Sequence, residues 1–219
     1  GFEHITTGSA ADSIWGGSGN SSILSGQGAD YVNDLVGNNF IDVGKDRTGY
    51  NDGSGDTVVT GAGNDTIYTG GGYYESVSAG DGNNYIDMLG SSGYAASITS
   101  GSGDDTIVGF IGTAYSRQWA TANWGASHPY TVGFLNAGDG NNYIKSSAAW
   151  LYGAESVVTG SGNDYIDVTG GSSGEYGMDT VFSGAGNDTV YVGSAYSGYS
   201  DYQVVDAGDG DDQVYAYVS

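Results

Sequence analysis

The stretch "GAGNDTIY" at residues 61–68 decides the fold, because close variants of it return along the whole chain. The variants are "GDGNNYID" from residue 80, "GSGDDTIV" from 101, "GDGNNYIK" from 138, "GSGNDYID" from 160, "GAGNDTVY" from 184 and "GDGDDQVY" from 208. Neighbouring copies start 19 to 37 residues apart. A phrase that recurs in this way indicates a repeat architecture, in which each repeat is stabilised by its neighbours.

A step of nine residues underlies the phrase. Its fifth position holds the acid of "GAGND", and early in the chain that position recurs every nine residues at Asp12, Ser21, Asp30 and Asn39. The same step later links Asp56 to Asp65, Glu75 to Asn84, Glu155 to Asp164 and Asp179 to Asp188. We therefore expect a nine-residue unit, two units in each coil, and variable segments inserted mainly on one edge.

Short apolar segments flank each glycine turn. Val58 precedes Gly61 and Ile67 follows Asp65, and the same pair of apolar positions recurs in most later copies. With few residues between turns, a period of two predicts very short strands, each with one side chain pointing inward. One unit cannot bury a core alone, so successive units must stack. The predicted fold is all-β, a parallel β-roll or β-solenoid forming one domain over residues 1–219, with a loop insertion at about 112–130.

Composition excludes several classes of protein. The 219 residues include 42 Gly and one Pro without a strict triplet, which excludes a collagen-like triple helix. A net charge of −22, from 26 acidic against four basic residues, argues against nucleic acid as a partner. There is no Cys, and no apolar run is long enough for a transmembrane helix. Regular β-branched positions and 13% aromatic residues argue against a permanently disordered acidic chain.

The repeated acids point to bound cations. Coils stack ~4.8 Å apart, so Asp65 is expected near an equivalent acid of the next coil. At that distance and an effective dielectric constant of about 20, two carboxylates repel by roughly 3.5 kcal/mol. A column of such pairs would exceed the stability of a folded domain. Because the turns offer only oxygen ligands, the cation that suits them best is Ca²⁺, with several ions per chain.

At this point the chain resembles the RTX (repeats-in-toxin) family, whose calcium-binding nonapeptide is G-G-x-G-x-D-x-U-x. The match is carried by "TGAGNDTIY", "TSGSGDDTIV" and "FSGAGNDTVY", which place Asp65, Asp105 and Asp188 at the ligand position. Asp30, Asp164 and Asp212 match equally well, and Asp12 matches with Ala10 in place of a glycine. The resemblance implies a bacterial protein, exported by a type I system, that folds in millimolar calcium outside the cell.

The predicted metal ligands are side chains at or beside the ligand position and the glycine carbonyls of the full turns. The side chains are those of Asp12, Asp30, Asp65, Asp81, Asn84, Asp105, Asp139, Asn142, Asp164, Asp188, Asp209 and Asp212. The glycines are Gly61, Gly63, Gly101, Gly103, Gly160, Gly162, Gly184, Gly186, Gly208 and Gly210. In the two "GDGNNY" turns Asn replaces the Asp, so these sites are either weaker or empty. The opposite edge lacks full glycine turns, and its acids are either further ligands or solvated turn residues; they are Asp56, Glu75, Glu155 and Asp179.

Two features suggest recognition surfaces. Side chains directly after the ligand position should point outward as a Tyr/Thr ladder, which either forms a lateral contact surface or reflects strand propensity alone. They are Tyr31, Phe40, Thr66, Tyr85, Thr106, Tyr143, Tyr165 and Thr189. The loop at 112–130 is rich in aromatic residues suited to a cell-surface glycan or protein. Its candidate contacts are Tyr115, Trp119, Trp124 and Tyr130.

The sequence thus predicts an extracellular, calcium-binding structural protein on a bacterial cell surface. Calcium-dependent folding and head-to-tail self-association into a filament, surface layer or adhesin are expected, because no capping element is visible. No catalytic residue is predicted. The alternatives are a non-catalytic RTX module of a secreted enzyme or toxin, and a glycan- or ice-binding module.

Overall fold

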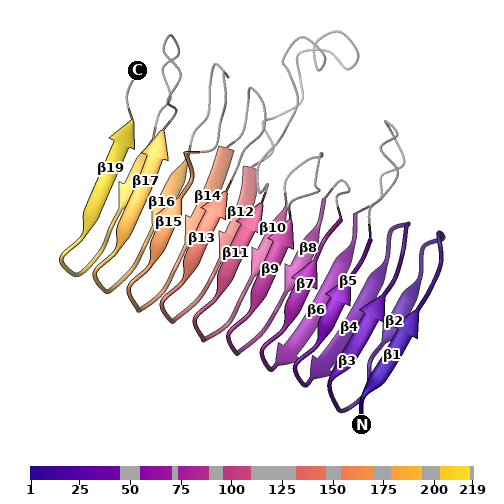
Figure 1. The fold of residues 1–219 in the computed structure, drawn as a ribbon. Coiled ribbons are helices and arrows are strands. Elements are labelled where there is room, and N and C mark those ends of the chain that lie inside the picture. The colour runs from indigo at the N-terminus through magenta and orange to yellow at the C-terminus, as the bar shows by residue number, and fades with distance from the viewer. Residues whose placement is uncertain are drawn as a thin grey trace, which may run out of the picture.

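A computed structural model describes residues 1–44, 55–70, 74–88, 96–109, 132–146, 154–169, 179–193 and 203–217. Strands alternate along the chain between two sheets, so that odd-numbered strands form a ten-stranded sheet and even-numbered strands a nine-stranded sheet (Figure 1). Every pairing between these strands is parallel. The predicted parallel β-solenoid is therefore confirmed. The described residues contain no helix, and so none that could cross a membrane.

The strands are short, as the spacing of the turns requires. The odd-numbered sheet consists of β1 (Glu3–Thr6), β3 (Ser21–Leu24), β5 (Phe40–Asp42), β7 (Thr66–Tyr68), β9 (Tyr85–Met88), β11 (Thr106–Gly109), β13 (Tyr143–Ser146), β15 (Tyr165–Asp167), β17 (Thr189–Gly193) and β19 (Gln213–Tyr217). The even-numbered sheet consists of β2 (Ser13–Trp15), β4 (Tyr31–Val36), β6 (Thr57–Ala62), β8 (Ser76–Ser78), β10 (Ser97–Thr99), β12 (Val132–Asn136), β14 (Ala154–Val158), β16 (Thr180–Phe182) and β18 (Val204–Asp206).

The strand register confirms the nine-residue unit. Glu3 lies beside Ser21 in the odd-numbered sheet, and Ser13 lies beside Tyr31 in the even-numbered sheet. Each of these pairs is 18 residues apart in the chain, which is two units. One coil therefore contributes one strand to each sheet, and a step of nine residues carries the chain from one sheet to the other.

The core lies between the two sheets and consists of one apolar ladder from each. Ile23, Ile41 and Ile67 continue one another in the odd-numbered sheet, and all three are fully buried. Val58 and Val77 occupy the facing ladder and are equally enclosed. These side chains alternate with outward ones along each strand, as the period of two predicts. Because each coil supplies only a few such residues, the core exists only where coils stack.

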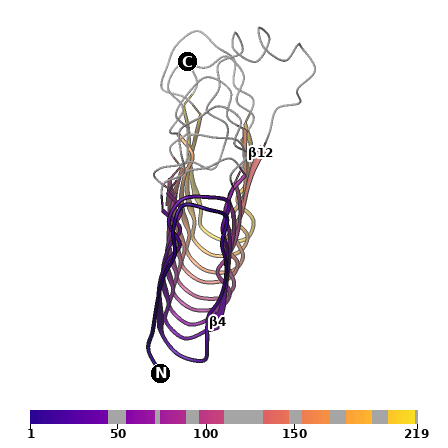
Figure 2. The ribbon, with the colours of Figure 1, turned by 90° about the vertical axis from the view of Figure 1, so that its right-hand side faces the viewer.

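The coils are flat, with strands on the long sides and turns on two edges (Figure 2). The connections from an even-numbered strand to the next odd-numbered strand hold the glycine turns, and we call this side the glycine edge. It forms the lower rim in Figure 1 and includes turns 61–65, 80–84, 101–105, 138–142, 160–164, 184–188 and 208–212. The connections from an odd-numbered to an even-numbered strand form the opposite edge. Chain-length variation falls on this second edge, as predicted.

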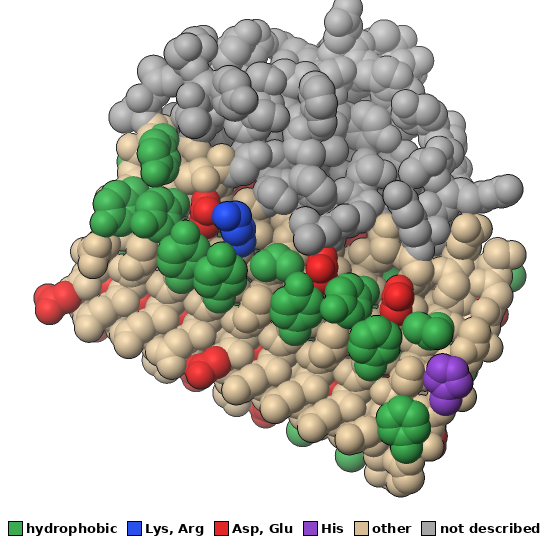
Figure 3. Space-filling view, in the orientation of Figure 1, with side chains coloured by type: hydrophobic (Ala, Val, Ile, Leu, Met, Phe, Trp, Pro, Cys, Tyr) green, Lys and Arg blue, Asp and Glu red, His purple; other side chains and the backbone are tan. Residues whose placement is uncertain are grey.

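The outer face of the odd-numbered sheet carries a row of aromatic side chains (Figure 3). The rings of Tyr143 and Tyr165 stack with centroids 5.0 Å apart, and those of Tyr191 and Tyr215 stack at 4.7 Å. The predicted outward ladder is thus present on this face from Phe40 onward. Tyr31 is an exception, because it lies on β4 in the other sheet.

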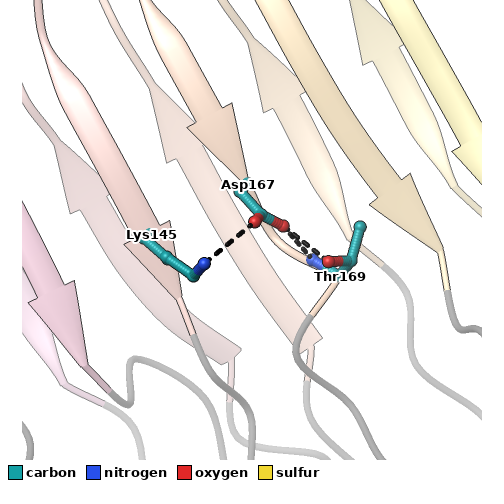
Figure 4. Close-up of polar contacts among 3 residues, drawn as sticks. All are labelled: Lys145, Asp167 and Thr169. Carbon is teal, nitrogen blue, oxygen red and sulfur yellow. Dashed lines mark hydrogen bonds and ion pairs between the residues drawn. The ribbon is translucent and has the colours of Figure 1, made fainter.

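One ion pair crosses this face (Figure 4). The Nζ of Lys145 lies 3.7 Å from Oδ2 of Asp167, and the Lys145 side chain is 54% exposed. The other oxygen of Asp167 accepts hydrogen bonds from the backbone N–H and the hydroxyl of Thr169.

Candidate metal sites

The glycine turns stack directly on one another. Gly63 and Gly186 have φ values of +146° and +144°, which an L side chain rarely adopts. A Cβ on Gly63 would clash with the carbonyl oxygen of Gly37 in the preceding coil, and one on Gly186 would clash with that of Gly162. The repeated glycines therefore let backbone carbonyls of successive coils approach closely, which fills the edge with oxygen atoms.

The ligand positions of the glycine edge form one buried column. Each side-chain oxygen accepts a hydrogen bond from the backbone N–H of the equivalent residue one coil earlier. Asp65 accepts from Asn39 at 2.8 Å, Asn84 from Asp65 at 3.0 Å, and Asp105 from Asn84 at 2.8 Å. The whole column reads Ser21, Asn39, Asp65, Asn84, Asp105, Asn142, Asp164, Asp188 and Asp212.

This order corrects the expectation that Asp65 stacks on another acid. Its neighbours in the column are Asn39 and Asn84, and those of Asp105 are Asn84 and Asn142. Charged and neutral side chains alternate over most of the column, so adjacent carboxylates meet only in the run from Asp164 onward. This alternation of Asp and Asn could not be recognised from the nine-residue step alone, because successive units lie on different edges.

The Asp turns contain oxygen atoms that lack a partner. One carboxylate oxygen of Asp65, Asp164 and Asp188 accepts the backbone hydrogen bond, while the other is buried and has no hydrogen-bond partner. Asp105 differs because its second oxygen accepts from the hydroxyl of Ser100. An uncompensated buried carboxylate oxygen is costly, and a cation would remove that cost.

Burial also shifts the protonation of these acids. Desolvation raises the pKa of Asp65 to about 6, and it raises the pKa of Asp105 and Asp164 above the ordinary value. The buried carboxylates therefore favour either a proton or a cation over the free charged form.

The donor set fits a hard cation whose shell includes main-chain oxygens. Among the residues that the structure describes, no three acidic or His side chains gather at one point. A metal on the glycine edge would therefore combine one or two carboxylates with the stacked carbonyls of turns such as Gly61–Gly63 and Gly184–Gly186. Calcium accepts six to eight oxygen ligands in flexible geometry, and backbone carbonyls are common among them.

Three predicted ligands lie on the exposed side of the turns. Oδ1 of Asp81 accepts hydrogen bonds from the backbone N–H of Ser102 at 2.8 Å and from its hydroxyl at 3.0 Å, and these bonds lower the pKa of Asp81. Asp139 makes the same two bonds with Ser161. Asp209 is also exposed. Asp81 and Asp139 thus link neighbouring coils across the outer surface, away from the buried column.

The opposite edge has its own acidic column, which includes Asp12 and Asp30, two residues that match the RTX ligand position. Asp30 accepts from the backbone N–H of Asp12 at 2.9 Å, Asp56 from that of Asp30 at 2.8 Å, and Glu75 from that of Asp56 at 3.1 Å. Asp12 and Asp30 therefore stack with Asp56 and Glu75, the acids for which the sequence left metal binding open. The four acids follow one another in consecutive coils, and Asp30, Asp56 and Glu75 are each at most 2% exposed. In the next coil Ala96 occupies the equivalent position, so the run of acids ends there.

Sequence reasoning missed two further features. Asp34, five residues before Asn39, is fully buried, and neither of its carboxylate oxygens has a hydrogen-bond partner. Its signal in the sequence was a charge at a place where later repeats carry Thr, Ser or Ala.

The second feature is an exposed ladder beside the buried column. In this ladder each side-chain oxygen accepts a hydrogen bond from a backbone N–H of the next coil. Its members are Asn20, Asn38, Asn64, Asn83, Asp104, Asn141, Asn163 and Asn187.

The aromatic residues proposed for partner binding lie outside the described residues. They are Tyr115, Trp119, Trp124 and Tyr130.

Comparison with known families agrees with this geometry. A family model described as the RTX calcium-binding nonapeptide repeat matches residues 6–41, 50–72, 92–113, 151–172 and 173–195, which is more than half of the chain. No curated protein matches the sequence.

Proposed function

Because the chain belongs to the family of RTX calcium-binding nonapeptide repeat proteins, we propose that it is an extracellular structural protein whose β-solenoid folds only in calcium. An RTX β-roll is a structural module. The proposed ligands are the buried carboxylates Asp65, Asp105, Asp164 and Asp188 of the glycine edge, with carbonyls of their turns. On the opposite edge, Asp12 and Asp30 are included.

The observation that carries this proposal is the set of buried, partnerless oxygens at Asp65, Asp164 and Asp188. Bound Ca²⁺ would supply the positive charge that neutralises them and would join successive coils. The chain's own residues hold the backbone in place for it, because each carboxylate already fixes the N–H of the preceding coil. Without that charge, ordering the glycine turns costs roughly 1–2 kcal/mol per residue, which a core this small cannot offset.

Circular dichroism and size-exclusion chromatography test the proposal. In excess chelator the β signal should disappear and the chain should expand, and Ca²⁺ should restore both. Sites of this extracellular kind should half-fill at about 10⁻⁴–10⁻³ M Ca²⁺. Equal concentrations of Mg²⁺ serve as the control and should restore little structure, because Mg²⁺ demands stricter geometry. An unchanged β spectrum and elution volume in chelator would refute calcium-dependent folding.

The expected half-filling at about 10⁻⁴–10⁻³ M Ca²⁺ would suit an extracellular location. A fold with sites of this affinity would be assembled outside a cell and remain unfolded where free calcium is scarce. We accordingly place the protein on or near a bacterial surface after type I export, as the family resemblance suggests. Calcium dependence of export into the medium by cells producing the full-length protein would test this placement.

Head-to-tail self-association is a second candidate property. β1 and β2 lie at one end of the two sheets and β18 and β19 at the other, and all side chains of β19 are exposed. Open strand edges are templates for further strands, and two unlike ends can join without closing into a ring. A second copy or further coils of a longer chain would fit there. Light scattering in Ca²⁺ should show polymers that chelator dissolves, and a strictly monomeric species at high concentration would contradict association.

A further inference from the structure

The Asn turns of the glycine edge differ from the Asp turns in how they are closed. Oδ1 of Asn84 accepts the backbone N–H of Asp65 at 3.0 Å, which fixes the orientation of the amide. Its Nδ2 then donates to the carbonyl oxygens of Gly80 at 3.2 Å and Gly82 at 3.0 Å. The amide group thus spans the inside of its own turn and satisfies two carbonyls.

Asn142 repeats this arrangement. Its Oδ1 accepts from Asp105 at 3.1 Å, and its Nδ2 donates to the carbonyls of Gly138 at 3.3 Å and Gly140 at 3.2 Å. Two separate turns therefore use the same pair of hydrogen bonds. The amide orientation follows from the network, because a reversed amide would point its NH₂ group at another N–H.

In the Asp turns the corresponding atom is an oxygen. Asp65, Asp164 and Asp188 use Oδ1 as the Asn residues do, so their Oδ2 takes the place of the amide nitrogen. That Oδ2 is buried and has no hydrogen-bond partner. A carboxylate oxygen beside carbonyl oxygens needs a positive charge, whereas an NH₂ group supplies positive hydrogens itself.

The residue five positions before the ligand position also differs between the Asn turns and most of the Asp turns. Ala79 and Ala137 precede the two Asn turns, whereas the Asp turns at 65, 105, 164 and 188 are preceded by Thr60, Ser100, Thr159 and Ser183. The hydroxyl of Ser100 donates to Asp105. The other three hydroxyls donate to backbone carbonyls of the next coil. In the last turn, Asp212 follows Ala207. The Asp turns at 65, 105, 164 and 188 thus differ from the Asn turns at a second position of the sequence as well.

We propose that the side-chain amides of Asn84 and Asn142 replace a cation in their turns. Turns 80–84 and 138–142 are then closed without metal, and ions on the glycine edge are confined to turns that carry a buried carboxylate. This inference rests on the proposed calcium binding and specifies where along the edge the ions bind. The chain would then have two turns closed by side-chain hydrogen bonds between coils that bind metal.

Asn84→Asp tests this role directly, with Asn83→Asp as the matched control. The control makes the same chemical change one residue away on the exposed side of the turn. Calcium bound per folded chain is measured by equilibrium dialysis at saturating Ca²⁺. Asn84→Asp should bind at least one more ion than the unmodified protein and need more Ca²⁺ to fold, whereas Asn83→Asp should bind the original number. An unchanged ion count in Asn84→Asp would overturn the inference.

The reverse substitution keeps the test decisive if Asn84→Asp does not fold. Asp65→Asn should lose an ion yet fold at a lower Ca²⁺ concentration than Asp65→Ala, because only the new amide can donate to the carbonyls of Gly61 and Gly63. Equal folding midpoints for the two variants would contradict the amide's role. If the unmodified protein binds no calcium, the proposed function fails; if it binds calcium but the variants behave alike, only this inference fails.

A separate observation points to a cation site at Asp34. This carboxylate is fully buried, and both of its oxygens lack a hydrogen-bond partner. It packs against the α-carbon of Gly16 in the preceding coil, where any side chain would collide with it, and Glu3 packs in the same way against Gly17. Asn39 cannot supply a charge to this turn, and its amide instead donates to the backbone carbonyl of Asp34 at 3.2 Å.

We infer that Asp34, with Glu3 beside it, binds a calcium ion at the start of the glycine edge. In this turn the negative charge is that of Asp34, five residues before Asn39 at the usual ligand position. Asp34→Asn should bind one ion fewer by the same dialysis measurement, and Glu3→Gln should lower the affinity for that ion. Asp42→Asn, which changes an acid on the outer face of β5, should leave the count unchanged. Equal counts for Asp34→Asn, Glu3→Gln and the unmodified protein would refute the site.

Discussion

Before Asp164, where adjacent acids begin on the glycine edge as well, the two edges of the solenoid distribute negative charge differently. On the glycine edge, Asn39, Asn84 and Asn142 separate Asp65 and Asp105 from their neighbours. On the opposite edge, Asp12, Asp30, Asp56 and Glu75 follow one another without interruption. Carboxylates in adjacent coils repel by roughly 3.5 kcal/mol, and doubling the separation halves that figure. Glycine content therefore does not by itself identify the edge that most needs cations; the order of charges matters as much.

The largest expected effect is that of pH on the calcium-free protein. Burial raises the pKa of Asp65 to about 6 and raises that of Asp105 and Asp164, so the folded state binds more protons than the unfolded state between the ordinary value of 3.8 and these raised values. Stability is then greatest below the unfolded pKa and is lost as pH rises toward 6 and above. Asp65 alone would contribute about 1–3 kcal/mol.

Acidification from pH 7 to pH 4.5 in chelator should accordingly stabilise the fold or restore β structure, as followed by circular dichroism during urea unfolding. In saturating Ca²⁺ the same change should destabilise it, because protons compete with the ion. A calcium-free protein that loses stability steadily on acidification would show that the buried acids are not the groups that limit folding.

The second effect separates adjacent from alternating charges. Asp30→Asn removes repulsion from two neighbouring acids, Asp12 and Asp56, whereas Asp105→Asn has only Asn84 and Asn142 as neighbours. Without calcium, Asp30→Asn should be more stable than Asp105→Asn by several kcal/mol, up to about 7 if both neighbours are charged. Chemical denaturation in chelator at pH 7, with a stabilising osmolyte added to keep the calcium-free chain folded, measures the difference. Equal stabilities would mean that the order of charges does not distinguish the edges.

The third effect compares a glycine stacked on a preceding coil with a glycine in the first described coil. Gly186→Ala on the glycine edge forces a Cβ into the carbonyl of Gly162 at a φ of +144° and should cost about 2–4 kcal/mol. Gly8 lies in the first described coil, where a Cβ would meet nothing within 4 Å. Gly8→Ala should therefore change stability by less than about 0.5 kcal/mol. Gly26 and Gly44 on the opposite edge approach the preceding coil in the same way. Thermal unfolding in saturating Ca²⁺ compares Gly186→Ala with Gly8→Ala, and similar losses would show that close approach between coils is not the source of the cost at Gly186.

The smallest effect lies on the sheet face, away from both edges. Lys145→Gln breaks the 3.7 Å contact with Asp167, but the Lys145 side chain is more than half exposed. Such pairs contribute about 0–1 kcal/mol and weaken in salt. Thermal unfolding at low and high salt should show a loss within that range. A larger loss would mean that charges on the face rival those on the edges.

Much of the fold could be predicted from the sequence because it depends on local rules. The nine-residue step, the inward Ile and Val positions and the glycine turns all follow from spacing and backbone sterics. The edge that Asp12 and Asp30 occupy could not be predicted, because a nine-residue step alternates between edges and only the strand register shows which acids share one.

Other features of the site depend on contacts between coils and could not be read from one unit. The role of the Asn84 amide depends on its contacts with the carbonyls of Gly80 and Gly82, which only the folded turn brings beside it. Asp34 belongs to no motif; the sequence shows only a charge where later repeats carry Thr, Ser or Ala, and its burial without a partner shows the importance of that charge. Asp81 matched the expected chemistry, but its oxygen is directed to Ser102 on the exposed side.

Anomalous X-ray diffraction from crystals grown in calcium tests the central claim most directly, because it locates each ion relative to each turn. The account predicts calcium peaks beside the second carboxylate oxygen of Asp65, Asp164 and Asp188, and none inside turns 80–84 and 138–142. Peaks inside the two Asn turns, or an ordered solenoid with no calcium at any of the three carboxylates, would contradict it.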